Sequence, residues 1–225
     1  MSIRNPLSLA LLAIFVCGCA ATPSKLTTQK QRISYVVGYR IGENLKNERM
    51  DIDSKALMLA INDAESGRPA RLSSDQMRAA VLAYQHKREA DQATLAQRNL
   101  AAGTKFLAAN AKKPGVVTLP SGLQYKVITE GKGPRPNVSD TVVANYRGLL
   151  IDGTEFDSSY KRGKPATFPL TGVIQGWQQA LQLMPVGSKW RVYIPANLAY
   201  GAGGVGSVIV PNETLIFDIE LLKIK

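Results

Sequence analysis

Hydrophobic residues are spaced for helices in the first half of the chain and for strands in the second half. In residues 30–48, one apolar residue recurs every four positions, which is typical of a helix with one apolar face. This stripe consists of Ile33, Val37, Ile41 and Leu45. A second helix is expected after Asp53, which can cap it, and should end before Gly67.

A long third helix is predicted to begin after Ser73. Ser73 and Gln76 have the spacing of a capping box, in which each side chain bonds to the other residue's free backbone N–H. The segment that follows has no proline and only one glycine, Gly103, until Pro114 stops it. About 37 residues at 1.5 Å each give a helix of roughly 55 Å. Residues 85–92 are almost wholly polar, so we expect this stretch to bridge between parts of the molecule.

The second half of the chain has the period of strands. After residues 120–122 (Pro-Ser-Gly), apolar residues alternate with polar ones, which predicts strands with one buried face. The inward residues are expected to be Leu123, Tyr125, Val127, Trp190, Val192, Ile194, Leu215, Phe217, Ile219 and Leu221. A short helix fits residues 176–183. An antiparallel sheet wrapped on one helix is an α+β domain.

The N-terminus resembles an export signal. Arg4 precedes an apolar run at residues 7–16, which is typical of a secretory signal peptide and too short to span a bilayer. Residues 16–19, Val-Cys-Gly-Cys, resemble a bacterial lipobox, in which cleavage occurs before Cys19 and Cys19 then carries a lipid. An ordinary cleaved signal with two incidental cysteines is the alternative. With Cys17 removed and Cys19 acylated, no thiol would remain for a disulfide, a metal or catalysis.

The net charge and the single histidine limit which kinds of partner and active site are expected. The formal net charge is +11, but the basic residues are dispersed and include no run of five. We therefore favour a solvated basic surface that would attract anionic envelope surfaces, and we do not expect nucleic-acid binding in a secreted protein. The only histidine, His86, falls in the polar stretch of the long helix. A Ser-His-Asp triad or a histidine-based metal site is therefore not expected, and neither is a cofactor.

Two further motifs have ordinary explanations. Residues 201–206 match the G-x-G-x-x-G dinucleotide pattern, but β-like residues that end at Pro211 follow them instead of a helix. A glycine loop beside a pocket is the favoured interpretation. Asp152 precedes a glycine and fits a turn. Asp157 could act as a general acid or base, but no second carboxylate stands near it in the sequence.

Four separated motifs, in order, resemble the FKBP-type peptidyl-prolyl cis-trans isomerases. These motifs are residues 146–159, 173–177, 195–201 and 215–222. The helical segment before them is similar to that of the macrophage infectivity potentiator (Mip) group of this family. After the signal peptide predicted at 1–18, the resemblance implies a helical dimerisation module at 19–72, a long linker helix at 73–113 and an isomerase domain at 114–225. The implied fold class is α+β, with an all-helical N-terminal module, a stalk helix and an FKBP-like antiparallel sheet wrapped on a short helix.

The resemblance also implies a set of site residues. Spacing alone would make these aromatic and aliphatic residues ordinary core residues, whereas the family places them around a proline pocket. The set is Tyr146, Phe156, Asp157, Val173, Ile174, Trp177, Tyr200, Ile209 and Phe217. In the implied roles, Trp177 is the floor, the Ile174 N–H and the Tyr200 hydroxyl hold peptide carbonyls, and Asp157 is fixed by a hydrogen bond to a tyrosine. Tyr146, Phe156, Val173 and Phe217 form walls, and Ile209 lies on a closing loop. Ala166 replaces a pocket phenylalanine of small family members and would open one wall.

The expected function is acceleration of X–Pro isomerisation in exported or surface proteins, without a cofactor. The expected partners are proline-containing polypeptides, macrolide inhibitors of the FK506 and rapamycin type, and a second copy of the chain. A monomeric three-helix bundle is the alternative to the dimer, and an envelope chaperone with a silent pocket is the alternative function. The lipid would anchor the protein to a membrane. Ala20 lacks the acidic character linked to inner-membrane retention, which favours an outer-membrane lipoprotein that faces the periplasm or the surface.

Overall fold

The structure, a computed structural model, describes residues 25–225, so the predicted signal peptide and Cys19 lie outside the described residues. The described chain forms two compact units that divide between Asp51 and Ile52. The first contains helix α1 (Gln29–Asn47), which begins at a capping box formed by Thr28 and Gln31. No residue of α1 is buried. The predicted first helix is thereby confirmed, and Ile33, Val37 and Ile41 of its apolar stripe are exposed.

The second unit begins with a short helix that is capped as predicted. Helix α2 (Ser54–Glu65) starts at Asp53, whose carboxylate accepts hydrogen bonds from two backbone N–H groups of the first turn. Near its other end, Asp63 is buried and forms ion pairs with Arg68 and Arg71 at 3.1 and 2.5 Å. These ion pairs fasten the segment that leads into the next helix.

The long helix α3 (Ser74–Asn110) has 37 residues, in agreement with the predicted length. Ser73 and Gln76 form the predicted capping box. Only Gly103 and Asn110 of this helix are buried, and both lie in its C-terminal third. The helix therefore ends against the sheet domain, whereas the apolar residues of its first turns are exposed.

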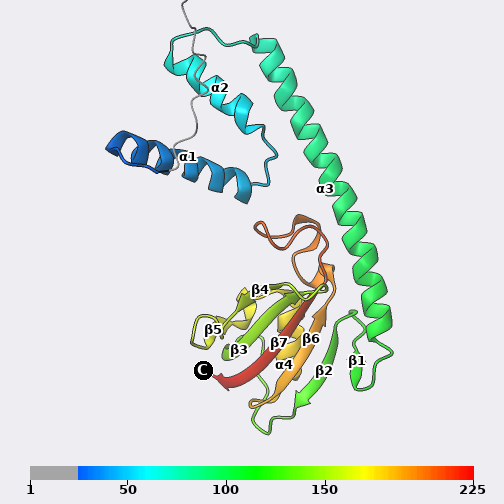
Figure 1. The fold of residues 1–225 in the computed structure, drawn as a ribbon. Helices are drawn as coiled ribbons and strands as arrows, with labels where there is room; N and C mark the ends of the chain where they lie inside the picture. The colour runs from blue at the N-terminus through cyan, green and yellow to red at the C-terminus, as the bar shows by residue number, and fades with distance from the viewer. Residues whose placement is uncertain (1–24) are drawn as a thin grey trace, which may run out of the picture. The chain divides into compact units, whose positions relative to one another are not determined.

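The remainder of the chain is one antiparallel sheet with a short helix (Figure 1). Its strands are β1 (Val116–Thr118), β2 (Gln124–Thr129), β3 (Thr141–Leu150), β4 (Glu155–Ser158), β5 (Ala166–Pro169), β6 (Lys189–Ile194) and β7 (Leu215–Ile224). Their order is β1-β2-β6-β7-β3-β4, and β5 pairs with the other half of the β3 edge that β4 uses. Helix α4 (Gln175–Leu183) follows a 3₁₀ turn at Leu170–Gly172. Two further 3₁₀ turns, Ala196–Leu198 and Gly201–Gly203, lie between β6 and β7.

The core lies between the sheet and α4. Along β7, every second residue is buried, as the alternating pattern predicts. Ala180 and Leu181 of α4 are fully buried against this face. Gly176 allows the helix to approach β6, because a Cβ there would lie 2.4 Å from the Ile194 side chain. The predicted α+β class and the helix at residues 176–183 are confirmed.

Val127 and Tyr193 are among the strand positions that differ from the alternating pattern. Val127 was expected to face the core but is 37% exposed, because the register between β2 and β6 shifts at this point. Tyr193 lies on the outward side of β6 and is nevertheless buried, because Phe106 of α3 packs on it with a ring distance of 6.0 Å. The second difference arises because a helix distant in sequence covers part of the outer face of the sheet.

Candidate active site

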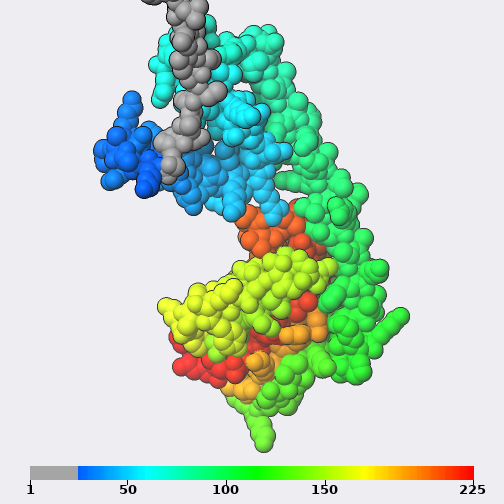
Figure 2. Space-filling model, in the orientation of Figure 1, coloured from blue at the N-terminus to red at the C-terminus, as the bar shows by residue number. Residues whose placement is uncertain are grey.

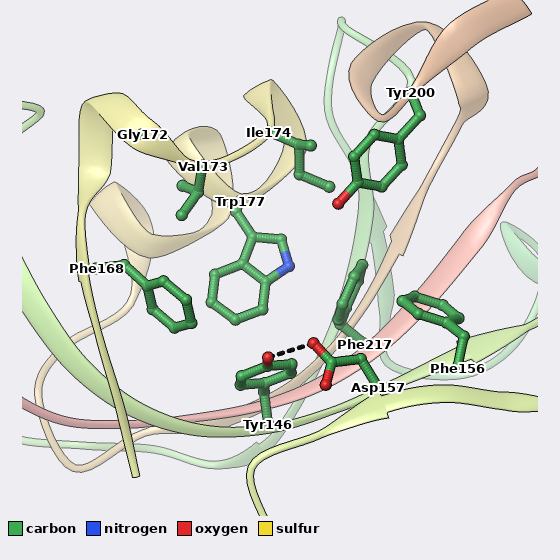
Figure 3. A pocket seen from close by; sticks show the side chains of 10 residues that line it. All are labelled: Tyr146, Phe156, Asp157, Phe168, Gly172, Val173, Ile174, Trp177, Tyr200 and Phe217. Carbon is green, nitrogen blue, oxygen red and sulfur yellow. Dashed lines mark hydrogen bonds between the residues drawn. The ribbon is translucent and has the colours of Figure 1, made fainter. Parts of the chain in front are cut away.

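A cavity of about 260 Å³ opens between the sheet and the N-terminal end of α4. It is lined by Tyr146, Phe156, Asp157, Phe168, Gly172, Val173, Ile174, Trp177, Tyr200 and Phe217. Figure 3 shows these side chains turned toward one another around the indole of Trp177. The wall is mostly aromatic, and Asp157 supplies its only carboxylate.

Trp177 lies at the centre of an edge-to-face cluster of rings. Its indole meets Tyr146, Phe168 and Phe217 at centroid distances of 5.2, 5.5 and 5.3 Å, each close to perpendicular. Such edge-to-face pairs are favourable beyond the area that they bury. The indole is 4% exposed, and its Nε1–H has no hydrogen-bond partner within the described chain. The base of the cavity is therefore rigid and apolar, and it keeps one donor unused.

The backbone around the cavity is shaped to bring these rings together. Gly148 of β3 allows Phe156 and Phe217 to pack on the strand, because a Cβ there would lie 2.6 and 2.9 Å from their rings. On the opposite side, the Gln178 side chain donates a 2.8 Å hydrogen bond to the Val173 carbonyl. This bond holds the segment that enters α4.

Asp157 is fixed by two donors at the rim of the cavity. The Tyr146 hydroxyl donates to one carboxylate oxygen, as drawn in Figure 3, and the Arg162 guanidinium donates to the other. Arg162 also donates to the Tyr146 hydroxyl at 2.6 Å. The Ser158 N–H adds a 2.8 Å bond to Asp157. The expected hydrogen bond between Asp157 and a tyrosine is present, and the tyrosine is Tyr146.

These contacts decide the protonation states at the rim. Burial opposes the charged form of Asp157, but the hydrogen bonds from Tyr146 and Arg162 and the guanidinium charge outweigh it and lower the pKa of the carboxyl. Burial and the bond to Asp157 raise the pKa of Tyr146. Burial and the nearby charge of Asp157 raise the pKa of Tyr200. At neutral pH, Asp157 is thus a carboxylate and both tyrosines are protonated donors.

Two donors on the cavity wall are not used by the protein itself. The Ile174 N–H precedes the first turn of α4 and has no acceptor among residues 25–225. Backbone N–H groups at a helix N-terminus point outward and accept anionic or carbonyl partners. The Tyr200 hydroxyl likewise has no partner within the described residues, and in Figure 3 it points toward the space above Trp177. The cavity therefore combines an apolar base with two free donors near its mouth.

Most of the sequence-predicted residues lie together. Eight of the nine line this cavity, and Ile209 does not. Ile209 is 6% exposed and packs in the core, where it also pairs with Val205. Its predicted role on a closing loop stays a prediction.

The sequence reasoning missed three residues at the site. Phe168 lines the wall that Ala166 was expected to leave open, while Ala166 is not among the lining residues. Gly172 is also on the wall. Arg162 was missed although it is the cation that holds Asp157. An aromatic two positions after Ala166, on the same side of a strand, was the available signal for Phe168.

The remaining candidate chemistries find no support in the geometry. The Gly201–Gly203 turn leads to Val205 and Ile209, and no helix follows before β7, so the dinucleotide motif lacks its context. Asp152 accepts a 2.8 Å bond from the Thr154 N–H within a turn, which lowers the pKa of its carboxyl. His86 is exposed on α3. Within residues 25–225, no group of three histidine, cysteine or acidic side chains is placed to hold a metal ion.

Comparison with known proteins points to one family. The family model for the FKBP-type peptidyl-prolyl cis-trans isomerase matches residues 133–222. The model for the domain amino-terminal to FKBP-type isomerases matches residues 30–127. Together these matches extend over the helical region and the sheet domain.

Individual relatives match over nearly the whole chain. An outer membrane protein MIP of Legionella longbeachae is 48% identical, with 95% of this chain and 94% of the relative covered. A peptidyl-prolyl cis-trans isomerase Mip of Coxiella burnetii is 43% identical, with 92% and 90% covered. The crystal structure of FkpA from Escherichia coli is similar with a TM-score of 0.64 at 37% identity, and covers 89% of this chain and 99% of that chain.

The lowered pKa of Asp157 predicts an acid-sensitive contribution to stability. The carboxyl has a folded-state pKa below its ordinary value of 3.8, so its contribution is present above that value and is lost as the pH falls through the folded-state pKa. Asp157→Asn should therefore be less stable than the wild type at pH 7, and the difference should shrink at about pH 3. Because the side chain is 41% exposed, we expect a difference below about 1 kcal/mol.

Urea unfolding of both proteins at the two pH values measures this effect. Other carboxylates with lowered pKa values, such as Asp63 and Asp218, are present in both proteins and cancel in the difference. A difference that stays the same or grows on acidification would contradict the assigned charge state of Asp157.

Proposed function

The chain belongs to the FKBP-type peptidyl-prolyl cis-trans isomerase family, and from that premise we propose that the cavity above Trp177 is the site at which the chain accelerates rotation about the X–Pro bond. The observation that carries this proposal is the meeting of six aromatic residues in one cavity with two hydrogen-bond donors at its mouth that have no partner among residues 25–225. The enzyme accelerates cis-trans isomerisation of peptidyl-prolyl bonds, as the family does. We propose in addition which residues of the cavity accelerate the reaction and which polypeptides are the substrates.

The physical obstacle to this reaction is amide resonance. Rotation about the X–Pro bond has a barrier of roughly 18–20 kcal/mol and takes tens of seconds or longer without a catalyst. Resonance places negative charge on the carbonyl oxygen, which water stabilises, and a twisted amide has lost this charge separation. An apolar cavity therefore raises the free energy of the planar ground state more than that of the twisted state. This is differential binding of the transition state, and no covalent intermediate is required.

The residues of the cavity have roles in this mechanism. The proline ring would rest on the Trp177 indole, which is nearly fully buried and held by edge contacts from three rings. The Ile174 N–H and the Tyr200 hydroxyl would donate to carbonyl groups of the substrate on either side of the ring, because neither has a partner among residues 25–225. Fixed donors orient the peptide without a cost of reorganisation.

Asp157 has a different role. Its charge is balanced by Arg162, so it holds Tyr146 in place at the wall and does not act as a proton carrier. A carboxylate with a lowered pKa is a poor base at neutral pH, which fits a reaction that moves no proton. Macrolides of the FK506 and rapamycin type would bind in the same cavity, since their recognition in this family uses the proline site.

Asp157→Ala and Tyr200→Phe are each expected to lower kcat/KM for a proline-containing peptide. Asp157→Ala removes the acceptor that holds Tyr146 and Arg162, and Tyr200→Phe removes a donor to the substrate. A loss of about 1–3 kcal/mol is expected for each, which is roughly five- to 150-fold in rate. Both variants should also bind a macrolide inhibitor more weakly. A protease-coupled isomerase assay and inhibitor titration measure the two effects.

Tyr125→Phe is the matched control. Tyr125 is a half-buried tyrosine that stacks on Trp190 at 4.3 Å, away from the cavity, so its variant should keep full activity. Wild-type rates in both Asp157→Ala and Tyr200→Phe would remove these residues from the mechanism. A wild-type protein that has no isomerase activity but suppresses aggregation of an unfolded protein would favour the chaperone alternative.

We propose that the enzyme is a homodimer formed through its N-terminal helices. Four apolar or aromatic residues of α1, such as Ile33 at 54% and Val37 at 52%, are largely exposed in the single chain. Met77, Val81 and Leu82 at the start of α3 are exposed as well. An apolar stripe of this kind is stable only when another surface covers it. The monomeric bundle is less favoured, because none of the residues of α1 is buried.

The dimer has a direct test. A soluble chain that begins at residue 22 should have the mass of a dimer by light scattering at micromolar concentration. A chain shortened to residues 92–225 lacks α1 and α2 and should be a monomer that keeps its activity on short peptides, because the whole cavity lies within it. Ile33→Asp and Val37→Asp should also yield monomers. A monomeric mass for the longer chain would refute the dimer.

We propose that the protein is exported and held at a membrane by a lipid on Cys19. Supporting this placement, the Legionella relative is named an outer membrane protein. Across residues 25–225 there is no helix that is long and apolar enough to cross a membrane. The lipid would anchor the protein without spanning the membrane, and basic side chains on the surface would add attraction to anionic lipid. The substrates would then be exported or surface polypeptides.

Cys19→Ser is expected to abolish incorporation of a radioactive fatty acid, because the thiol that would carry the lipid is removed. Cys17→Ser is the matched control and should leave labelling intact, since Cys17 would be cleaved off. The measurement is metabolic labelling followed by membrane fractionation. Labelling that persists without Cys19, or that never occurs in the wild type, would leave an ordinary cleaved signal as the explanation.

A further inference from the structure

The C-terminal half of α3 is packed on the isomerase domain along one continuous face. Its buried and half-buried positions follow a helical period that includes Asn99, Gly103, Phe106 and Asn110. At Gly103 the approach is so close that a Cβ would lie 2.2 Å from the Thr214 hydroxyl. At Asn110 the side-chain amide donates a 2.9 Å bond to Gln124 of β2. This half of the helix is therefore part of the domain and not a free linker.

Two asparagines join α3 to the loop between β6 and β7. The Asn99 side-chain amide donates to the Pro211 carbonyl at 2.9 Å. In the opposite direction, the Asn212 side-chain amide donates to the Ala96 carbonyl at 3.2 Å. Figure 2 shows this loop, in orange, beside the green part of α3. The two bonds form a reciprocal pair between segments that are more than 100 residues apart in sequence.

Asn212 also connects this contact to the cavity. Its backbone N–H donates a 2.9 Å bond to the carbonyl of Gly201, the residue that follows Tyr200. Its φ of 58° is left-handed, a conformation that asparagine adopts more readily than most residues. Asn212 thus holds α3 with its side chain and the Tyr200 segment with its backbone.

The tip of the loop is largely exposed, whereas the residues from Ile209 to Thr214 are buried or half-buried. Val205 and Val208 are 48% and 45% exposed. A single bridge joins Val205 to Ile209, which is buried. Only the tip of the loop lacks buried contacts, so the Asn99 and Asn212 bonds, together with the buried Ile209, set the position of the loop.

We propose that Asn99 and Asn212 are positioning residues, through which α3 fixes the 201–214 loop and with it the Tyr200 hydroxyl at the mouth of the cavity. The proposal rests on the proposed role of Tyr200 as a donor to the substrate. In this proposal α3 contributes to substrate binding and is not only a spacer. Substrate recognition would then weaken when α3 loses its hold on the loop, although no residue of the cavity has changed.

Asn99→Asp and Asn212→Asp test this in the full-length chain. Each change keeps the size of the side chain but replaces the donor amide with a carboxylate that faces a carbonyl oxygen. Gln97→Glu is the matched control, because it makes the same charge change on an exposed position of α3. The measurements are kcat and KM for a proline-containing peptide, amide hydrogen exchange at Asn212 and Val205, and the thermal unfolding midpoint.

Both aspartate variants should raise KM about five- to tenfold, as expected for the loss of one hydrogen bond, with a smaller change in kcat. Exchange at the Asn212 N–H should accelerate by a similar factor, while Gln97→Glu behaves as the wild type. If either aspartate variant fails to fold, the same measurements are made on Asn99→Ala and Asn212→Gly, with the same expected results. Glycine keeps the positive φ at position 212 and removes only the side-chain bond.

Two results would overturn the proposal. Unchanged exchange at Asn212 in the folded variants would show that α3 does not hold the loop. Faster exchange with unchanged KM would show that the hold does not serve substrate binding. Tyr200→Phe, measured in parallel, separates the causes: a raised KM in that variant leaves the proposed role of Tyr200 intact, whereas an unchanged KM removes that role as well.

Discussion

The edge-to-face packing of three aromatic rings on the Trp177 indole is the contact on which the site depends. Tyr146 comes from β3, Phe168 from β5 and Phe217 from β7, so the cluster forms only when three strands and α4 have assembled. It gives the cavity a floor that is both rigid and dry. A dry floor is the physical requirement for destabilising a planar amide, because the carbonyl charge of the ground state loses its water there. Fold and chemistry therefore depend on the same rings.

The polar groups around this floor are divided between structure and substrate. Asp157 is saturated by Tyr146, Arg162 and the Ser158 N–H, and serves to keep a wall in place. The Ile174 N–H and the Tyr200 hydroxyl have no partner in the part of the chain that the structure describes. An unpaired donor in a partly dry site costs free energy in the empty protein, and in the proposed mechanism a substrate carbonyl removes that cost on binding. This division explains how a site without a proton carrier or a nucleophile can still be specific for a peptide.

Features set by local sequence could be predicted, and features set by distant contacts could not. Asp53 and the Ser73–Gln76 capping box predicted helix starts because caps involve residues two or three apart. Eight of the nine site residues were placed by motif resemblance. The packing of Phe168 depends on β5 pairing with β3, and the burial of Tyr193 depends on a helix nearly 90 residues away. The Asn99 and Asn212 bonds are of the same kind, since neither residue belongs to a local pattern.

The direct measurement of the central claim is an NMR titration of the ¹⁵N-labelled enzyme with a short X–Pro peptide. The protein carries an internal comparison, because the indole N–H groups of Trp177 and Trp190 are both buried and have no partner among the described residues. Only Trp177 lies in the cavity. The account predicts a shift of the Trp177 indole resonance that saturates with the peptide, accompanied by exchange peaks between its cis and trans forms, and an unmoved Trp190. Accelerated exchange with an unmoved Trp177, or an equal shift of both indoles, would contradict it.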